Sequence, residues 1–161
     1  MTAQPIRLLG DPVLRSRATE VVDFDKEFHG LVRDMWDTME ATGGAGLAAP
    51  QIGVDLRVFT YHCDGHAGHL VNPVVEVLGE GYQDGPEGCL SIPGVSVDCR
   101  RHLEVVATGW NMYGEPIEVT GDHLLARCVQ HEVDHLDGVL YVDRLEPRAR
   151  EFALRAAGGE R

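Results

Sequence analysis

Residues 122–138 read DHLLARCVQHEVDHLDG, and apolar side chains recur in this stretch at intervals of three and four residues. That spacing predicts an amphipathic helix. Asp122 has a side chain that commonly caps the first turn of a helix, and Gly138 is a common type of C-terminal stop. One face of the predicted helix carries Leu124, Leu125, Cys128, His131, His135 and Leu136. We therefore expect both histidines to point into the interior of the protein.

His131, Glu132 and His135 form an H-E-x-x-H pattern. Residues four apart on a helix lie on one face about one turn apart, so both imidazoles can bind a single ion. Glu132 lies beside them, where it can take a proton from water without serving as a ligand. The alternative is a pair of core histidines, but a buried glutamate beside them would be costly without a cation. The pattern therefore predicts a divalent metal site in a hydrolase.

The third metal ligand is less clear from the residues alone. A catalytic site of this kind uses three protein ligands and keeps one position open. Cys128 lies about 4.5 Å along the helix axis from His131, too far for a thiolate that needs a bond of about 2.3 Å, so we interpret it as pocket wall. Cys89 lies in residues 86–93, PEGCLSIP, a bent and constrained segment that we expect to be a loop between strands. Such a loop can approach a helix closely, but its composition leaves open whether Cys89 is a ligand.

The remaining segments predict both helices and strands. Apolar residues at helical spacing from Phe28 to Met39 predict a helix from about 25 to 41, which the run GGAG at 43–46 ends. Another helix is expected at Pro147–Ala157. Segments rich in Val, Ile, Leu and Tyr, separated by Gly, Pro and Asp, predict strands. These segments are Arg57–Tyr61, Leu70–Leu78, Leu103–Gly109 and Ile117–Thr120.

The order of these segments predicts an α+β fold. We expect mixed or antiparallel β-sheets packed around a central metal-binding helix, with N-terminal and C-terminal helices. The length of 161 residues suits a single catalytic domain, 1–161, in which 148–161 form a C-terminal surface helix and tail.

Composition and charge exclude several classes of protein. The formal net charge of −12 makes a nucleic-acid-binding module a poor candidate. No segment approaches the roughly 18 consecutive apolar residues of a membrane helix, and the N-terminus does not resemble a secretory signal. The four cysteines show no C-x-x-C spacing, and we interpret Cys63 and Cys99 as small buried strand residues. We expect a cytoplasmic, reduced monomer.

Three segments together resemble the signature motifs of the peptide deformylase family. They are GAGLAAPQ at 44–51, EGCLS at 87–91 and QHEVDHL at 130–136. They occur in the family's order and spacing, and the resemblance extends from DPVLR at 11–15 to Asp143. Family members remove the formyl group from the N-terminal formylmethionine of newly made bacterial and organellar polypeptides and release formate.

The resemblance implies that Cys89, His131 and His135 bind the metal. Ferrous iron is the expected ion, and zinc, nickel or cobalt can substitute. Glu132 would take a proton from water and return it to the departing amine. The expected partners are N-formylmethionyl nascent peptides, encountered at the ribosome.

The resemblance also implies two donors to the formyl oxygen, which gains negative charge during the reaction. They are the side chain of Gln51 and the backbone N–H of Leu90. The alternative to a donor role is that Gln51 is a solvent-exposed glutamine in a loop. Gln130, next to a histidine ligand, is a candidate support for that ligand.

Five residues are expected to contact the substrate. Gly44, Ala45 and Gly46 would let the backbone close around the formyl group, the smallest acyl group. Leu124 and Cys128 lie on the histidine face of the helix and would line the pocket for the methionine side chain, unless they only pack the core.

The sequence departs from the family pattern at three places. Ala45 is smaller than the usual branched residue, which would widen the cleft. His123 stands where glycine is common, and residues 84–86 lack a usual second glutamate. None of these is a proposed ligand.

Two other kinds of protein share parts of this pattern. A zinc endopeptidase also has H-E-x-x-H, but no histidine follows His135 as a third ligand. A structural metal site in a binding protein would need a fourth ligand and would leave Glu132 without a role.

Overall fold

The computed structural model describes residues 3–158 and shows a mixed α and β fold with antiparallel sheets, so the predicted fold class is confirmed. Its helices are α1 (Lys26–Thr42), α2 (His123–Leu136) and α3 (Pro147–Ala156), with 3-10 turns η1 (Pro12–Arg15), η2 (Ala49–Ile52) and η3 (Tyr141–Arg144). Its strands are β1 (Gly46–Ala48), β2 (Val58–Cys63), β3 (His66–Val77), β4 (Tyr82–Gln83), β5 (Pro86–Cys89), β6 (Ile92–Asp98), β7 (Arg101–His102), β8 (Glu104–Trp110) and β9 (Pro116–Asp122).

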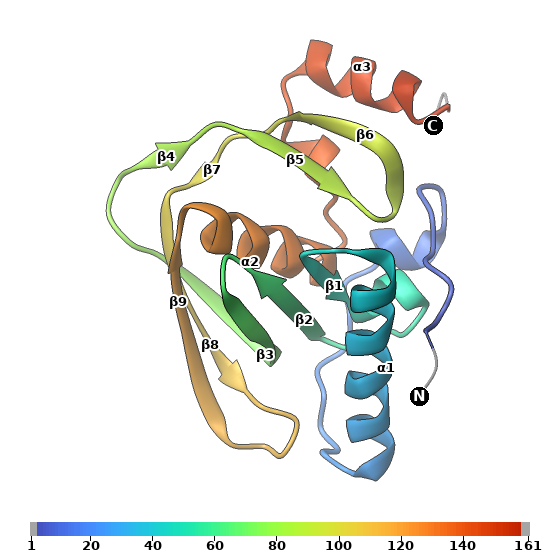
Figure 1. The fold of residues 1–161 in the computed structure, drawn as a ribbon, viewed down its shortest axis with the longest axis vertical. Coiled ribbons are helices and arrows are strands. Elements are labelled where there is room, and N and C mark those ends of the chain that lie inside the picture. The colour runs from blue at the N-terminus through green and yellow to red at the C-terminus, as the bar shows by residue number, and fades with distance from the viewer. Residues whose placement is uncertain (1–2, 159–161) are drawn as a thin grey trace.

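The helix α2 lies at the centre of the fold (Figure 1). The five-stranded sheet, in the order β1-β2-β3-β8-β9, lies on one side of it, and the β5–β6 hairpin lies on the other. The helix α3 packs against β6, beyond that hairpin. Every pair of neighbouring strands in the named sheets is antiparallel. A helix enclosed in this way has few positions that face water, which explains why its histidines are buried.

Each side of the central sheet covers an apolar cluster. Between α2 and the sheet lie Phe59, Leu70, Val105, Leu125, Val129 and Leu136. Between α1 and the sheet lie Val32, Met35, Met39, Leu47, Val58 and Val71. Burying a side chain of this size stabilises the fold by about 1.5–3 kcal/mol.

The helices, and all the long strands except β6, are those that local sequence patterns predict. The helix α1 begins after Asp25, whose side chain accepts a hydrogen bond from the Phe28 N–H at 2.9 Å, and ends at Gly43, where φ is +69°. The four predicted strands correspond to β2, β3, β8 and β9. The C-terminal surface helix is present as α3, while residues 159–161 of the predicted tail lie outside the described residues.

Two local predictions are wrong. Residues 86–93 are not a loop, because Pro86–Cys89 is a strand that pairs with Ile92–Asp98. This pairing depends on a partner strand, which glycine and proline content does not indicate. Asp122 precedes α2 but makes no capping hydrogen bond. His123 has φ of +49°, which displaces the first turn from the geometry that a capping side chain needs.

Within residues 3–158, every helix is too short or too polar to cross a membrane.

The C-terminal end of α2 is fixed by close contacts with the N-terminal segment. The Leu136 carbonyl accepts hydrogen bonds from the Ala18 N–H and from Arg57 Nη1, both at 2.8 Å. Gly138 follows with φ of +76°, and a Cβ atom built on it would lie 2.7 Å from the Arg15 carbonyl oxygen. Only glycine therefore fits both the backbone conformation and the space.

Gly138→Ala should destabilise the protein clearly more than Gly43→Ala. Both glycines have a left-handed backbone conformation, in which alanine costs about 1–2 kcal/mol. A Cβ at Gly43 would meet no atom within 4 Å, whereas at Gly138 it meets backbone. We expect urea unfolding to show a loss of about 1 kcal/mol in the free energy of unfolding for the Gly43 variant. The loss for the Gly138 variant should be at least twice as large. Equal losses would show that the contact with Arg15 does not constrain the fold.

Candidate metal centre

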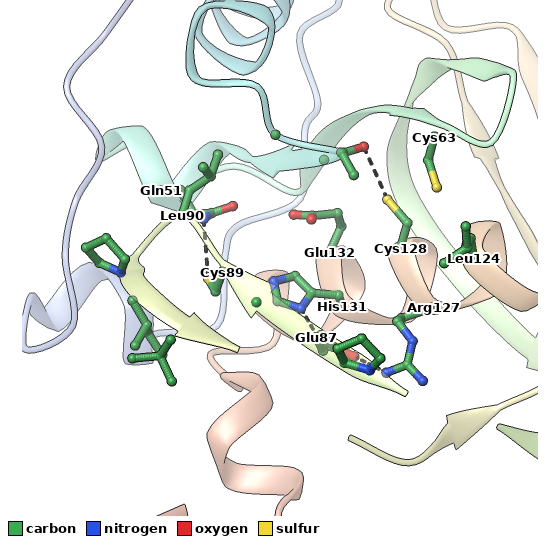
Figure 2. Close-up of a pocket in the computed structure, with 18 of the residues that line it drawn as sticks. Gln51, Cys63, Glu87, Cys89, Leu90, Leu124, Arg127, Cys128, His131 and Glu132 are labelled. Carbon is green, nitrogen blue, oxygen red and sulfur yellow. Dashed lines mark hydrogen bonds and ion pairs between the residues drawn. The ribbon is translucent and has the colours of Figure 1, made fainter. Parts of the chain in front are cut away.

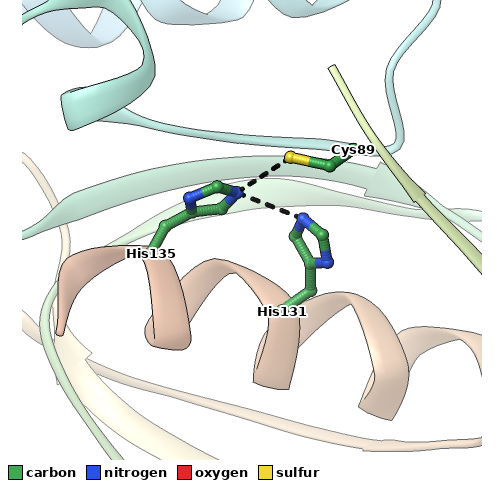
Figure 3. Close-up of side chains that lie close together, drawn as sticks. All are labelled: Cys89, His131 and His135. Atoms are coloured by element: carbon green, nitrogen blue, oxygen red, sulfur yellow. Dashed lines mark hydrogen bonds between the residues drawn. The ribbon is translucent and has the colours of Figure 1, made fainter. Parts of the chain in front are cut away.

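Three side chains converge on one point between α2 and the β5–β6 hairpin. They are Cys89, His131 and His135, whose ligand atoms all lie within 4.8 Å of one another (Figure 3). The two Nε2 atoms are 3.2 Å apart, and Cys89 Sγ is 3.3 Å from His135 Nε2. Tetrahedral bonds of about 2.0–2.1 Å to nitrogen and 2.3 Å to sulfur would separate these atoms by about 3.3 and 3.6 Å. These two separations are therefore close to those of a tetrahedral divalent metal site.

Two elements bring these three side chains together. His131 and His135 are one turn apart on α2 and are 7% and 1% exposed. Cys89 is the last residue of β5, where the register with β6 shifts between Gly88 and Cys89. The hairpin thus presents the sulfur to the buried face of the helix. Within residues 3–158, none of the other three cysteines belongs to this group of possible metal ligands.

Glu87 holds His131 in place from the side opposite the metal position. Its Oε2 atom is 2.6 Å from His131 Nδ1, and the carboxylate also accepts hydrogen bonds from Arg101 and Arg127. Burial alone would raise the pKa of Glu87, but hydrogen bonds from His131 and Arg101 outweigh it and hold the pKa well below its ordinary range. A carboxylate here keeps the proton of His131 on Nδ1, which leaves Nε2 free to bind a metal.

The charges of the two imidazoles differ. Burial alone would lower the pKa of His131, but hydrogen bonds to Cys89 and Glu87 raise it well above its ordinary value. Burial, together with the charge on His131, lowers the pKa of His135 well below its ordinary value. Of the two rings, His131 is therefore the one that holds a proton more readily.

The sequence motifs did not predict the role of Glu87, although its position in the strand carries a signal. Residues two apart in a strand share a face, so Glu87 points to the same side of β5 as Cys89. Arg101 continues the network, because its Nη1 donates to Asp134 at 2.7 Å and Arg144 donates to the same carboxylate at 2.8 Å. These partners come from distant parts of the chain, and no spacing in the sequence indicates them.

Glu132 is buried beside the ligands and faces the cavity. It is 3% exposed, and its Oε1 atom has no hydrogen-bond partner within residues 3–158. Burial raises the pKa of Glu132 to about 7, against the opposing charge of His131. A Cβ atom on Gly46 would lie 2.6 Å from its Oε2, so a side chain at that position would displace the carboxyl group. A carboxyl group with this pKa can both accept and donate a proton near neutral pH.

Gln51 is 1% exposed, so the alternative of a solvated glutamine is wrong. Its Oε1 accepts a hydrogen bond from the Ala48 N–H at 3.0 Å. Its Nε2 donates to Ser91 Oγ at 3.1 Å and lies 3.7 Å from Cys89 Sγ. The amide N–H group is thus held next to the donor group. The prediction that Gln130 supports His131 is wrong, because the Gln130 side chain instead forms hydrogen bonds with the backbone N–H and carbonyl of His102.

A cavity of about 550 Å³ opens onto Glu132 and the metal position (Figure 2). All five predicted substrate contacts line it, and so does Leu90. Those five residues are Gly44, Ala45, Gly46, Leu124 and Cys128. The interior position expected for Leu124 is wrong, because 56% of its surface is exposed in the first turn of α2.

Two further residues line the cavity, and the sequence did not predict them there. Cys63, interpreted as a small buried residue, is only half-buried and lines the cavity wall. Arg127 lines the same cavity and donates to Glu87 and to the Cys99 carbonyl. Cys63 ends β2, so its position depends on how far that strand extends along α2, which the sequence does not indicate.

Comparisons with known proteins agree on one family. A family model described as polypeptide deformylase matches residues 3–151. A peptide deformylase from Acidothermus cellulolyticus is 58% identical over 156 residues, which cover 97% of this chain and 86% of that protein. A solved peptide deformylase from Legionella pneumophila matches with a TM-score of 0.91 at 41% identity, covering 97% of this chain and 94% of its own. The enzyme from Synechococcus elongatus in complex with actinonin matches with a TM-score of 0.91 at 40% identity, covering 98% and 88%.

Glu87→Gln should weaken metal binding by about 10- to 100-fold, the range for removing a partner of a metal-bound histidine. The amide keeps the shape of the carboxylate but loses the charge that orients His131. Competition with a zinc chelator measures the affinity, and circular dichroism checks the fold. Asp84→Asn is the control, because it breaks an ion pair with Arg100 whose side chains are 65% and 58% exposed. Equal affinity in both variants would show that Glu87 does not support the site.

Proposed function

The chain belongs to the peptide deformylase family, and we propose that its metal is bound by Cys89, His131 and His135. It is a metal-dependent hydrolase that removes the formyl group from the N-terminal formylmethionine of newly synthesised polypeptides and releases formate. The observation that carries the ligand assignment is the convergence of one sulfur and two imidazoles, whose ligand atoms all lie within 4.8 Å of one another.

Ferrous iron is the proposed native ion, with zinc, nickel or cobalt as substitutes. Two imidazoles and one thiolate suit all four of these divalent ions. When bound, the metal acts as a Lewis acid that polarises the formyl oxygen and makes water more acidic. Three ligands leave a position open for this chemistry, whereas a structural site would need a fourth.

Glu132 is the proposed general base and acid. Its unpartnered Oε1 atom and its pKa of about 7 support a role in proton transfer. The carboxylate takes a proton from the attacking water as its oxygen bonds to the formyl carbon. It then gives that proton to the amine nitrogen as the C–N bond breaks, so that formate and a free N-terminus are released.

Gln51 and Leu90 are the proposed donors to the formyl oxygen. The Ala48 N–H holds Oε1 of the Gln51 amide, and its Nε2 points to Ser91 Oγ and Cys89 Sγ, which supports a role as a donor beside the metal position. Leu90 follows the ligand Cys89 at the hairpin turn and lines the cavity, which supports a role for its backbone N–H. Loss of one such donor typically costs about 3–4 kcal/mol in the transition state.

The proposed substrate contacts lie on two walls of the cavity. Gly44, Ala45 and Gly46 form one wall, where side chains on the glycines would meet Leu90 or Glu132. Leu124 and Cys128 form the methionine pocket, where a thiol and an exposed aliphatic group offer the soft surface that a thioether prefers. The exposure of Leu124 argues against the alternative that it only packs the core.

The substrate indicates where in the cell the enzyme acts. Nascent polypeptides leave the ribosome in the cytoplasm, so we expect the enzyme to act there on N-formylmethionyl chains, as a monomer formed by one catalytic domain. Its net charge of −12 gives no support for direct binding to nucleic acid.

Glu132→Ala should keep the metal and lose nearly all turnover. Glu132 lies beside the ligands without belonging to the group of three, and a positioned acid–base group contributes about 10²–10⁴ in rate. Formate release from formyl-Met-Ala-Ser and metal content should be measured on the same sample. A metal-free variant, or one with a near-normal rate, would contradict the assignment.

Cys89→Ser should weaken metal binding by at least about 10- to 100-fold. That range is typical when a residue that only hydrogen-bonds to a metal ligand is removed, and loss of a ligand itself should cost no less. Cys99→Ser is the matched control, because Cys99 is 1% exposed and lies outside the ligand group. Metal content after dialysis against a chelator separates the two variants. Stoichiometric metal in Cys89→Ser would remove Cys89 from the ligand set.

A further inference from the structure

Arg127 is a buried cation in the wall of the cavity. It is 7% exposed and lies on α2, four residues before His131. Within residues 3–158, no other lysine or arginine lines this cavity. Residues three and four apart on a helix are neighbours, so Arg127 lies between Leu124 and His131 along α2. Figure 2 shows Leu124, Arg127 and Cys128 on this wall. A positive charge therefore lies at the pocket proposed for the methionine side chain.

Within the described residues, one end of the Arg127 guanidinium has no hydrogen-bond acceptor. Its Nη1 atom donates to Glu87 Oε1 at 2.8 Å and to the Cys99 carbonyl at 2.7 Å. Its Nη2 atom is buried and has no hydrogen-bond partner within residues 3–158. A charged donor that is buried without an acceptor is costly. A ligand that brings an acceptor to Nη2 would therefore gain free energy there.

The opposite wall has room for such an acceptor. Gly85 immediately precedes β5, and a Cβ atom built on it would lie 3.5 Å from Arg127 Nη2, an ordinary van der Waals contact. Apart from Gly85 and its two chain neighbours, no other heavy atom of the described residues lies within 4 Å of that point. A small group can therefore occupy the space beside Gly85 and contact Nη2.

The charges and size of the cavity limit what this acceptor can be. Glu87 and Glu132 line the same cavity, so a ligand with negative charge is disfavoured. A thioether sulfur is only a weak acceptor, so an ordinary methionine side chain satisfies Nη2 poorly. Methionine sulfoxide has the same carbon chain, carries no net charge and adds one strongly polar oxygen. Its oxygen is therefore the acceptor that best matches the pocket.

We propose that Arg127 is a specificity-determining residue that lets the enzyme act on chains whose N-terminal formylmethionine is oxidised to the sulfoxide. The sulfoxide oxygen accepts a hydrogen bond from Arg127 Nη2 in the space beside Gly85. The formyl group meets Glu132 as it does in the unoxidised substrate. The assignment rests on the proposed function, and the bonds that form and break are those of that reaction.

A pocket without this donor would reject the sulfoxide. Burying a polar group that has no hydrogen bond typically weakens binding by about 5- to 150-fold. A hydrogen bond to a charged group strengthens it by about 10- to 150-fold, so the two effects nearly cancel. We therefore expect the protein to use the two substrates at similar rates.

The experiment compares kcat/KM of the nickel-loaded protein for formyl-Met-Ala-Ser and for the same peptide with each epimer of methionine sulfoxide. In the parent protein, the faster epimer should be within about tenfold of the unoxidised peptide. In Arg127→Met, which removes the donors but keeps a long side chain, the ratio of sulfoxide to methionine rates should fall at least tenfold. Arg100→Met is the matched control and should keep the parent ratio, because Arg100 is exposed and lies outside this cavity.

Gly85→Ala tests the contact without removing the arginine. Gly85 is not among the glycines with left-handed backbone, and the added methyl group would fill the space beside Nη2 without a clash. We expect this variant to lose sulfoxide turnover selectively, with formyl-Met-Ala-Ser turnover close to that of the parent. If Arg127 only supports His131 through Glu87, Arg127→Met should instead lower both rates equally and Gly85→Ala should change neither ratio nor rate.

Three results would overturn the assignment. They are a parent protein more than tenfold slower on both sulfoxide epimers, an Arg127→Met ratio that falls less than tenfold, and a Gly85→Ala ratio equal to that of the parent. Turnover of formyl-Met-Ala-Ser without turnover of the sulfoxide would contradict the role of Arg127 alone. Absence of turnover on both peptides would contradict the proposed function as well.

Discussion

The Glu87 carboxylate joins the two parts of the chain that make the site, because it lies on β5 with Cys89 and accepts a 2.6 Å hydrogen bond from His131 on α2. Arg101 and Arg127 bind the same buried carboxylate, so its charge is compensated on three sides. Removing one partner from such a group commonly costs about 3–5 kcal/mol, because a charge is then left buried alone. The network therefore couples the distance between ligands to the stability of the fold.

Close backbone approach is the second requirement of the site. At Gly46, β1 passes so near α2 that a side chain would meet Glu132, and at Gly138 the end of α2 meets the backbone of Arg15. At Gly46 the close approach helps to bury the Glu132 carboxyl group, and burial raises its pKa to about 7. The same enclosure that removes water from Glu132 thus gives it a pKa suited to proton transfer near neutral pH.

Local patterns predict the parts of the fold that depend on neighbours in sequence. The helices α1 and α2 follow from apolar spacing, and β2, β3, β8 and β9 follow from runs of branched and aromatic residues. The strand β5 could not be predicted, because its glycine-rich sequence becomes a strand only by pairing with β6. The H-E-x-x-H spacing indicates two ligands and a base, but the role of Glu87 and the place of Cys63 depend on contacts between distant segments.

X-ray absorption of the zinc-loaded protein tests the central claim most directly, because it measures the ligands of the metal itself. We predict one sulfur at about 2.3 Å and two imidazole nitrogens at about 2.0–2.1 Å, with a further light atom at the open position. In Cys89→Ser the sulfur signal should disappear while the imidazole signals remain. A spectrum of the parent protein with no sulfur, or with two, would contradict the proposed set of Cys89, His131 and His135.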